Sequence, residues 1–420
     1  MSNLNSTPAG ERTHIGLFGR RNAGKSSLIN ALTGQNLAVV ADVPGTTTDP
    51  VLKAMELLPL GPVLMMDTAG IDDTGELGAL RVQKSLQILN KTDIAIVVID
   101  STTGFTEEEQ KLLKQIRDKK LSCVVVFTKA DLAKTTDTST QGSEYTNKKN
   151  VEKEVIPSFI PQISVSATTG KNIHELKELL AHLVPQKKTP YPICADLVQV
   201  GDTVLLVTPI DSAAPKGRLI LPQQQTLRDI IDAGASAIVT QENNITRVLE
   251  NLKTPPVMVI TDSQAFEKVD RAVPKEISLT SFSILMARHK GNLKQAVLGV
   301  AALKDVEDGN HILISEGCTH HRQCGDIGTE KLPKWIRQYT GKDLIFSWTS
   351  GTEFPSDLSA YRLIIHCGGC MLNEREMQYR YHCAADQGIP MTNYGLCIAF
   401  IHGILKRSLS IFPNLAKKLE

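Results

Sequence analysis

The segment Gly19–Ser26 constrains the fold of this chain more than any other. It reads Gly-Arg-Arg-Asn-Ala-Gly-Lys-Ser and fits the pattern G-x-x-x-x-G-K-S/T. An apolar run, Ile15–Phe18, precedes it, and a helical pattern, Ser27–Leu32, follows it. In this order of strand, glycine loop and helix, backbone N–H groups point at phosphate oxygens. We therefore expect Lys25 to reach the β- and γ-phosphates of a nucleotide and the Ser26 hydroxyl to bind Mg²⁺.

The segment Asp67-Thr-Ala-Gly70 follows an apolar strand pattern and supplies the next part of such a site. We expect Asp67 to hold Mg²⁺ through water and the Gly70 N–H to sense the γ-phosphate. The next residue is Ile71, so the glutamine that orients water in Ras-like enzymes is absent. The acidic residues of the following loop, which can either orient water or be solvated charges, are Asp72, Asp73 and Glu76.

The segment Thr128-Lys129-Ala-Asp131, after the apolar strand Val124–Phe127, predicts which base is bound. A carboxylate at Asp131 can accept hydrogen bonds from both N1–H and the exocyclic amine of guanine. Adenine presents an acceptor at N1 and would leave that carboxylate unpaired. Ser164–Ala167, after another strand, then closes over the base. The nucleotide is therefore predicted to be GTP or GDP.

Together these segments resemble the translation-factor branch of P-loop GTPases. Thr128 stands where that branch usually has asparagine, and we expect this change to loosen the loop while leaving Lys129 and Asp131 intact. Gly19-Arg-Arg-Asn22 and Gly45-Thr46-Thr47-x-Asp49 also resemble the potassium-activated GTPases related to tRNA-modification and ribosome-assembly GTPases.

This second resemblance implies slow hydrolysis that K⁺ accelerates. It implies that Asn22 helps to coordinate K⁺ where an arginine finger would otherwise sit, although an ordinary loop cap is the alternative for Asn22. It also implies that Thr47 completes the Mg²⁺ shell beside Ser26 and Asp67. Catalysis would then rest on Lys25, Asn22, Thr47 and Gly70. The residues expected to bind the nucleotide and its ions are Gly19, Asn22, Ala23, Gly24, Lys25, Ser26, Ser27, Thr46, Thr47, Asp67, Gly70, Thr128, Lys129, Asp131, Ser166 and Ala167.

Strand-like and helix-like runs alternate along the chain, which predicts an α/β fold. We expect a P-loop GTPase domain over 1–185, a dimerisation domain over 193–280 and a cluster-binding domain with a small parallel sheet over 284–420. A Pro-rich basic linker lies between the first two. The middle block has no catalytic signature. Its expected elements are the strands 203–208, 237–240 and 257–260, the helices 227–233 and 245–252, and then one helix over 284–303.

Six cysteines gather in the last quarter of the chain, and two lie earlier, Cys123 and Cys194. The six are Cys318, Cys324, Cys367, Cys370, Cys383 and Cys397. In a cytosolic protein such clustering favours metal or redox chemistry over disulfides. The strand patterns His311–Ser315 and Tyr361–Ile365 precede Cys318 and the Cys367–Cys370 pair. If these strands are parallel, both cysteine loops leave the same edge of the sheet, where ligands bind in open α/β folds.

The metal is not decided by these residues alone, and a site without any metal is one of the alternatives. Cys318, Cys367 and Cys370 with His320 or His366 could form a Cys₃His zinc site. They could equally hold a [4Fe–4S] cluster whose fourth iron is exchangeable or has a non-cysteine ligand. His320 and His366 can be that ligand or hydrogen-bond donors behind the ligands. Other candidates are Cys324, Glu316 and Glu374. Arg375 and Arg380 predict either an exposed charged helix face or a site that attracts an anionic precursor.

The GTPase followed by Cys318-Thr-His320 and His366-Cys367-Gly-Gly-Cys370 resembles the [FeFe]-hydrogenase maturation GTPase family over essentially the whole chain. The resemblance implies a scaffold or carrier. A [4Fe–4S] cluster on Cys318, Cys367 and Cys370 would sit where a di-iron precursor is held before its delivery to apo-[FeFe]-hydrogenase. Two radical-SAM maturases would be upstream partners, and the middle domain would form dimers or higher oligomers.

Two other functions are weighed against this one. The first is a ribosome- or RNA-linked GTPase with a zinc-stabilised C-terminal module. A net charge of +1 and 5% aromatic residues disfavour it, and we expect no nucleic-acid partner. The second is a nucleotide-gated electron-transfer protein, which would need a fully ligated cluster. The polar N-terminus and the short apolar runs predict a cytoplasmic protein without a membrane partner.

Overall fold

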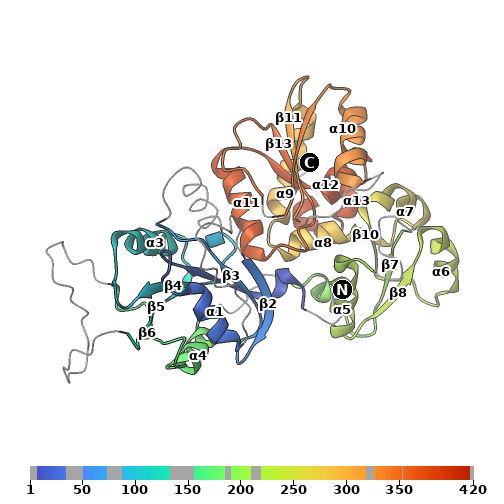
Figure 1. Ribbon diagram of the computed structural model, residues 1–420. Coiled ribbons are helices and arrows are strands. Elements are labelled where there is room, and N and C mark those ends of the chain that lie inside the picture. The colour runs from blue at the N-terminus through green and yellow to red at the C-terminus, as the bar shows by residue number, and fades with distance from the viewer. Residues whose placement is uncertain are drawn as a thin grey trace. The chain divides into compact units, whose positions relative to one another are not determined.

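The computed structural model describes residues 7–34, 51–72, 88–132, 156–184, 191–209, 219–317, 326–351 and 353–416. The chain divides into two compact units, Met1–Lys187 and Lys188–Glu420. Figure 1 labels the elements of both. The second unit contains two sheets, over residues for which the sequence predicts two domains.

The first unit is built on a six-stranded sheet with the order β2-β3-β1-β4-β5-β6. All pairs are parallel except β2 with β3, which is antiparallel. The strands are β1 (Thr13–Phe18), β2 (Val51–Leu57), β3 (Gly61–Asp67), β4 (Ile94–Asp100), β5 (Ser122–Thr128) and β6 (Gln162–Ser164). The helices are α1 (Lys25–Thr33), α3 (Glu107–Asp118) and α4 (Ile173–Leu183).

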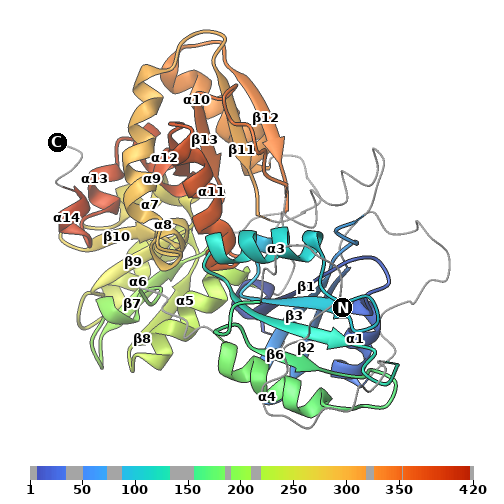
Figure 2. The ribbon, with the colours of Figure 1, turned by 90° about the vertical axis from the view of Figure 1, so that its left-hand side faces the viewer.

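Helices cover both faces of this sheet, which explains its apolar strands (Figure 2). Every residue of β4 is buried. Ile94, Ile96 and Val98 share one core with α1 and α4, whereas Ala95, Val97 and Ile99 share the other with α3. The described residues of the predicted nucleotide site lie in the loops after β1, β3, β5 and β6, at the last residues of β3 and β5, or in the first turn of α1. Because these strands are parallel, the loops leave one edge of the sheet.

The second unit contains two four-stranded sheets whose pairs are all parallel, with the orders β10-β9-β7-β8 and β12-β11-β13-β14. The first comprises β7 (Thr203–Val207), β8 (Ser236–Thr240), β9 (Met258–Thr261) and β10 (Ser278–Ser281). The second comprises β11 (His311–Ser315), β12 (Ile345–Thr349), β13 (Leu363–His366) and β14 (Met391–Asn393). One hydrophobic cluster contains residues of both sheets, for example Val259 and Ile312.

The helices of this unit are α5 (Leu221–Asp232), α6 (Ile245–Asn251), α7 (Phe266–Ala272), α8 (Phe282–His289), α9 (Leu293–Val300), α10 (Leu332–Thr340), α11 (Glu374–Asp386), α12 (Tyr394–Ile401), α13 (Leu405–Ser408) and α14 (Pro413–Ala416). The strands expected at 203–208, 237–240 and 257–260 are confirmed as β7, β8 and β9. None of the helices in the described ranges combines the length and apolar character that crossing a membrane requires.

The single helix expected over 284–303 is wrong, because the chain forms α8 and α9 with a turn between them. Gly291 has φ +79°, a left-handed conformation that ends α8. The N–H groups of Gly291 and Asn292 donate to the carbonyls of Arg288 and Ala287, both at 2.9 Å. The apolar pattern continues through the turn because both helices bury apolar residues, so the pattern alone conceals the break.

Candidate functional site

The glycine loop after β1 is held in shape by the lysine that is predicted to bind phosphate. Lys25 Nζ donates to the carbonyl oxygens of Gly19, at 2.9 Å, and Arg20, at 2.8 Å. Gly24 and Asn22 both have positive φ, and the Asn22 side chain is exposed. Asparagine tolerates this left-handed conformation better than most residues. The loop is therefore curved around the Lys25 ammonium, as a phosphate cradle requires.

Two predicted Mg²⁺ ligands meet at the end of β3. The Ser26 hydroxyl donates to Asp67 Oδ2 over 2.7 Å, while Asp67 Oδ1 is buried and has no hydrogen-bond partner among the described residues. Burial raises the pKa of Asp67. A hydroxyl and a carboxylate with an unsatisfied oxygen are ligands that suit Mg²⁺. Thr46 and Thr47, predicted to complete the site, lie outside the described residues.

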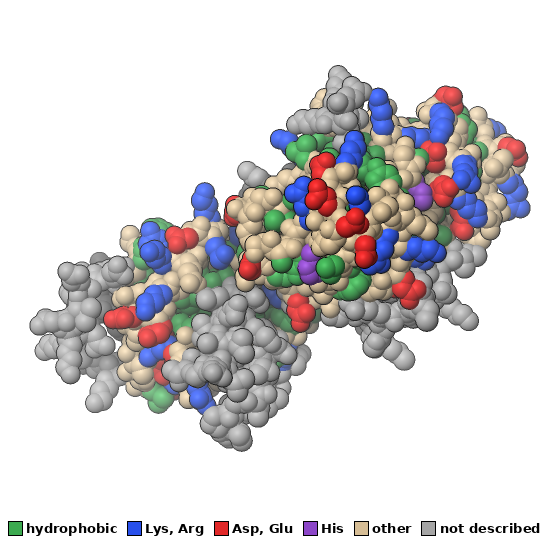
Figure 3. Space-filling model, turned by 90° about the horizontal axis from the view of Figure 1, so that it is seen from above, with side chains coloured by type: hydrophobic (Ala, Val, Ile, Leu, Met, Phe, Trp, Pro, Cys, Tyr) green, Lys and Arg blue, Asp and Glu red, His purple; other side chains and the backbone are tan. Residues whose placement is uncertain are grey.

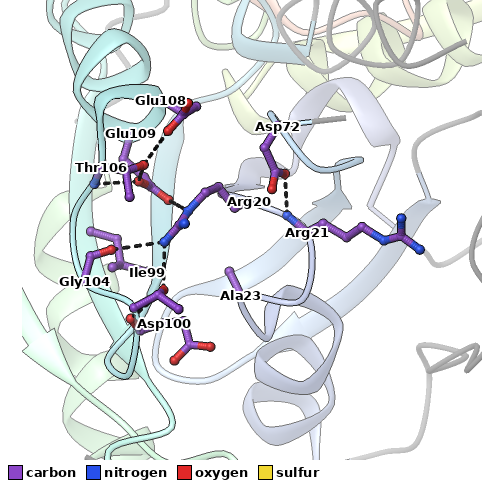
Figure 4. A network of polar contacts seen from close by, with 12 residues as sticks. Arg20, Arg21, Ala23, Asp72, Ile99, Asp100, Gly104, Thr106, Glu108 and Glu109 are labelled. Carbon is purple, nitrogen blue, oxygen red and sulfur yellow. Dashed lines mark hydrogen bonds and ion pairs between the residues drawn. The ribbon is translucent and has the colours of Figure 1, made fainter. Parts of the chain in front are cut away.

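The chain after β3 contacts the glycine loop (Figure 4). The Arg21 N–H donates to Asp72 Oδ1 at 2.7 Å, and the Ile71 N–H donates to the Gly19 carbonyl at 3.3 Å. A Cβ at Gly70 would lie 2.8 Å from the Arg21 nitrogen, so only glycine fits this approach. Asp72, one of the candidates to orient water, thus binds a backbone N–H of the phosphate loop. Asp73 and Glu76 lie outside the described residues.

Thr128 connects the base-recognition loop to the phosphate loop. Its hydroxyl lies 2.5 Å from the Ala23 carbonyl oxygen and 3.1 Å from that of Ile99, and the side chain is 2% exposed. Although threonine is shorter than asparagine, its hydroxyl therefore still reaches the phosphate loop.

The neighbours of Thr128 leave room for a base. Lys129 Nζ donates to Asp100 Oδ2 at 2.6 Å, while the Asp131 side chain is exposed. Burial raises the pKa of Asp100, but hydrogen bonds from Lys129 and Thr102 lower it overall. The Ala130 N–H donates to the Val165 carbonyl at 3.1 Å, which places the Ser164–Ala167 segment beside this loop. The Ser166 hydroxyl accepts from the Thr169 N–H at 3.2 Å.

Arg20 is a part of this site that the sequence analysis missed (Figure 4). Its guanidinium donates to Glu109 Oε1 at 2.7 Å, Thr103 Oγ1 at 2.8 Å and the Gly104 carbonyl at 3.1 Å. Glu109 is fully buried and also accepts from the Thr106 N–H at 2.9 Å, forming a capping box at the start of α3. The spacing of Thr106 and Glu109 is the signal that could have identified the helix start, though not its arginine partner.

The two predicted cysteine loops start side by side, as the parallel arrangement requires. β11 and β13 are parallel, and Ser315 is paired with His366 at their ends. The Cys367 N–H donates to the Ser315 carbonyl at 2.9 Å. Cys318, His320 and Cys324 lie outside the described residues. Across the described ranges, no group of three or more His, Cys, Asp and Glu side chains is arranged to hold a metal ion.

The Cys367 sulfur accepts two backbone hydrogen bonds. The Gly317 N–H lies 3.0 Å from Sγ and the Gly369 N–H 3.4 Å. Burial raises the pKa of the Cys367 thiol, and these two N–H groups oppose that rise. Burial raises the pKa of Cys370 to about 12. Backbone N–H donors of this kind stabilise negative charge on a cysteine sulfur.

His366 is fully buried, and both of its ring nitrogens have partners. Nδ1 lies 2.8 Å from the Cys367 carbonyl oxygen and Nε2 lies 2.9 Å from Arg380 Nη1. A guanidinium only donates, so Nε2 accepts and the proton is on Nδ1. Burial, and then the nearby Arg380, lower the pKa of His366 to about 3. Neither nitrogen is open to a metal in this arrangement.

Arg380 is completely buried, so the expectation of an exposed charged face is wrong for this residue. Its other partners are Glu376 Oε1 at 2.9 Å, Ser315 Oγ at 3.2 Å and the Gly351 carbonyl at 2.8 Å. Glu376 lies four residues earlier on α11, whereas Ser315 and Gly351 lie at or just after strand ends that are distant in the sequence. Glu316, another ligand candidate, accepts a hydrogen bond from the Tyr394 hydroxyl at 3.0 Å.

The other described cysteines belong to the hydrophobic cores. Cys123, Cys194 and Cys397 are buried among apolar side chains, and Cys383 packs against the main cluster of the second unit. On the face drawn in Figure 3, basic and acidic side chains are interspersed, as the net charge of +1 leads one to expect.

Four family models match the chain. Residues 193–291 match the hydrogen maturase F dimerization domain, and residues 294–411 match the hydrogen maturase F tetramerization domain. Residues 14–129 match a 50S ribosome-binding GTPase, and residues 81–186 match the elongation factor Tu GTP binding domain. The predictions of a GTPase and of the hydrogenase-maturation family are confirmed, and two oligomerisation domains indicate a homo-oligomer.

Curated relatives match the first half of the chain. The tRNA modification GTPase MnmE of Moorella thermoacetica is 34% identical over 177 residues, which cover 41% of this chain and 35% of MnmE. The GTPase Der of Wolinella succinogenes is 37% identical over 172 residues, which cover 39% of this chain and 34% of Der. The chain thus spans about a third of the length of these relatives. Among solved structures, Era of Aquifex aeolicus bound to GDP and AlF4⁻ is 17% identical with a TM-score of 0.33, covering 54% of this chain and 91% of Era.

Proposed function

The chain belongs to the hydrogen maturase F family, and from this premise we propose that it hydrolyses GTP in its first unit and carries a [4Fe–4S] cluster in its second. The cluster-bearing protein would hold a di-iron precursor and deliver it to apo-[FeFe]-hydrogenase. The observation that supports this most is the Cys367 sulfur, which accepts two N–H bonds where β11 and β13 end.

In the first unit, the residues fit GTP and Mg²⁺. Lys25 and the N–H groups of the glycine loop would hold the phosphates, and Ser26 and Asp67 would hold Mg²⁺ with Thr47. Mg²⁺ would neutralise charge on the β- and γ-phosphates. The exposed Asp131 carboxylate would recognise guanine, with Ser166 and Ala167 closing over the base. Asn22 would supply a K⁺ ligand at the exposed side of the same loop.

In the second unit, Cys318, Cys367 and Cys370 would hold the cluster, with His320 or an exchangeable group at the fourth iron. The cluster would supply an attachment point for the di-iron precursor. Two N–H groups on the Cys367 sulfur would stabilise its thiolate charge. The radical-SAM maturases would load this edge of the sheet, and the apo-hydrogenase would unload it.

GTP hydrolysis would regulate the dissociation of partners rather than cluster chemistry. The motivation is that every residue expected to bind the nucleotide lies in the first unit, far along the chain from the cysteines. The experiment is a transfer assay in which the reconstituted chain is incubated with both radical-SAM maturases and then added to apo-[FeFe]-hydrogenase. Activation that depends on the chain, with GTP changing its rate, is expected. Absence of activation, together with tightly bound zinc and retention on RNA, would favour the RNA-linked alternative.

A further inference from the structure

We infer that Arg380 is a positioning residue of the cluster site, and that it holds His366 as a support behind Cys367 rather than as a ligand. The inference rests on the proposed cluster-binding function and adds to it the device that sets the geometry of the cysteine loops. Of the two candidate histidines, it excludes His366 from the fourth ligand position and leaves His320.

Arg380 joins the strand ends from which the candidate loops leave. Nη1 donates to Ser315 Oγ, at the end of β11, over 3.2 Å, and to His366 Nε2, at the end of β13, over 2.9 Å. Nη2 donates to the Gly351 carbonyl, just after β12, over 2.8 Å. One side chain of α11 therefore fixes the spacing of three neighbouring strand ends. The loop with Gly317 and the loop with Cys367 both start at strand ends that Arg380 holds by hydrogen bonds.

The burial of this guanidinium is costly, which argues that its geometry matters. A buried ion pair is often no more stable than well-packed apolar side chains of the same size. Glu376, four residues earlier on α11, accepts from Arg380 Nε at 2.9 Å, and the two side chains are 6% and 0% exposed. The pair satisfies the charge, and the remaining donors of the rigid guanidinium fork are directed at the strand ends.

The same contact decides the role of His366. Because Arg380 can only donate, His366 Nε2 is an acceptor and Nδ1–H donates to the Cys367 carbonyl over 2.8 Å. The ring thereby fixes the peptide of Cys367, whose sulfur accepts from Gly317 and Gly369. A ligand role would require His366 to give up one of these buried partners.

The first test is pulsed electron paramagnetic resonance on the reduced, reconstituted full-length protein. We expect no strong ¹⁴N coupling from His366, so the wild-type spectrum and that of His366→Ala should agree. A strong ¹⁴N coupling in the wild type that disappears in His366→Ala would overturn the inference. This comparison needs no Arg380 variant, and a ¹⁴N coupling that persists in His366→Ala would come from another residue such as His320.

The second test measures the rate at which a chelator removes iron from Arg380→Gln. Residues that orient metal ligands typically change metal affinity about 10- to 100-fold, so we expect iron loss at least about tenfold faster than in the wild type. The matched control is Arg362→Gln, an exposed arginine that precedes β13. A circular dichroism spectrum and a thermal melt like those of the wild type would verify that the second unit of the variant folds, which the GTPase rate of the first unit does not report. Equal iron loss from both variants would refute the positioning role. Absence of iron from the wild type itself would instead refute the proposed cluster function.

Discussion

The Thr128 hydroxyl lies 2.5 Å from the Ala23 carbonyl oxygen, joining two loops that are 105 residues apart in the sequence. This bond links the phosphate loop to the base-recognition loop and leaves Asp131 exposed for the base. Threonine thus connects the two loops at a position where the translation-factor branch usually has asparagine.

Thr128→Val should weaken GTP binding, because it leaves the buried Ala23 carbonyl with one donor fewer. An unsatisfied buried acceptor costs about 1–3 kcal/mol, which corresponds to about 5- to 150-fold in affinity if the loss falls on the bound state. Fluorescent-nucleotide titration would measure it. Thr128→Ser keeps the hydroxyl and should bind GTP like the wild type; equal weakening by both changes would contradict the role of this hydrogen bond.

Asp131→Asn should exchange guanine for xanthine as the preferred base. The carboxylate accepts from two guanine donors, whereas an amide can donate to the 2-carbonyl of xanthine and accept from N1–H. Charged hydrogen bonds are worth about 1.5–3 kcal/mol, so GTP affinity should fall about 10-fold or more while xanthosine triphosphate affinity rises. Competition titrations with both nucleotides would measure this. Unchanged preference for GTP would place base recognition elsewhere.

Lys25→Ala should abolish GTP hydrolysis and leave the iron content of the reconstituted protein unchanged. The ammonium is expected on the phosphates, and its visible partners, the carbonyls of Gly19 and Arg20, lie in the same loop. On one preparation, phosphate release would measure GTP hydrolysis and iron analysis would measure the cluster content. A variant that also loses its iron would contradict the separation of hydrolysis from cluster binding.

Asp270 should make the stability of the second unit depend on acid pH. Its carboxylate binds Arg407, at 2.5 Å, and Lys275, at 2.8 Å. Burial raises the pKa of Asp270, but these hydrogen bonds lower it overall. A lowered folded-state pKa gives stability that is present above the ordinary value of 3.8 and is lost as pH falls through the lowered pKa.

Asp270→Asn should therefore unfold more easily than the wild type at neutral pH, by about 1 kcal/mol. The difference should shrink as the pH falls below 3.8, the ordinary pKa of this group. Urea unfolding followed across pH would reveal this convergence. A difference that stays constant down to acid pH would assign the effect of the substitution to packing instead.

Local motifs were enough to predict most of the nucleotide site. Lys25 and Asp131 follow a strand at a fixed spacing and Asp67 ends one, and parallel strands bring these segments to one edge. Contacts between distant segments could not be predicted this way. Arg380 looks like a surface residue of α11 because its partners at Ser315, Gly351 and His366 are far away in the sequence. The Thr128 contact was missed for the same reason.

Cluster binding by the second unit is tested most directly by anaerobic reconstitution with iron and sulfide, followed by metal analysis and electron paramagnetic resonance. The wild type would be compared with Cys318→Ser, Cys367→Ser and Cys370→Ser, with Cys383→Ser as the control. We expect about four irons per chain and a reduced [4Fe–4S] signal that shifts with added imidazole. The cluster should be lost in each of the first three variants and kept in the control. Tightly bound zinc without iron uptake would refute the proposed cluster-binding function.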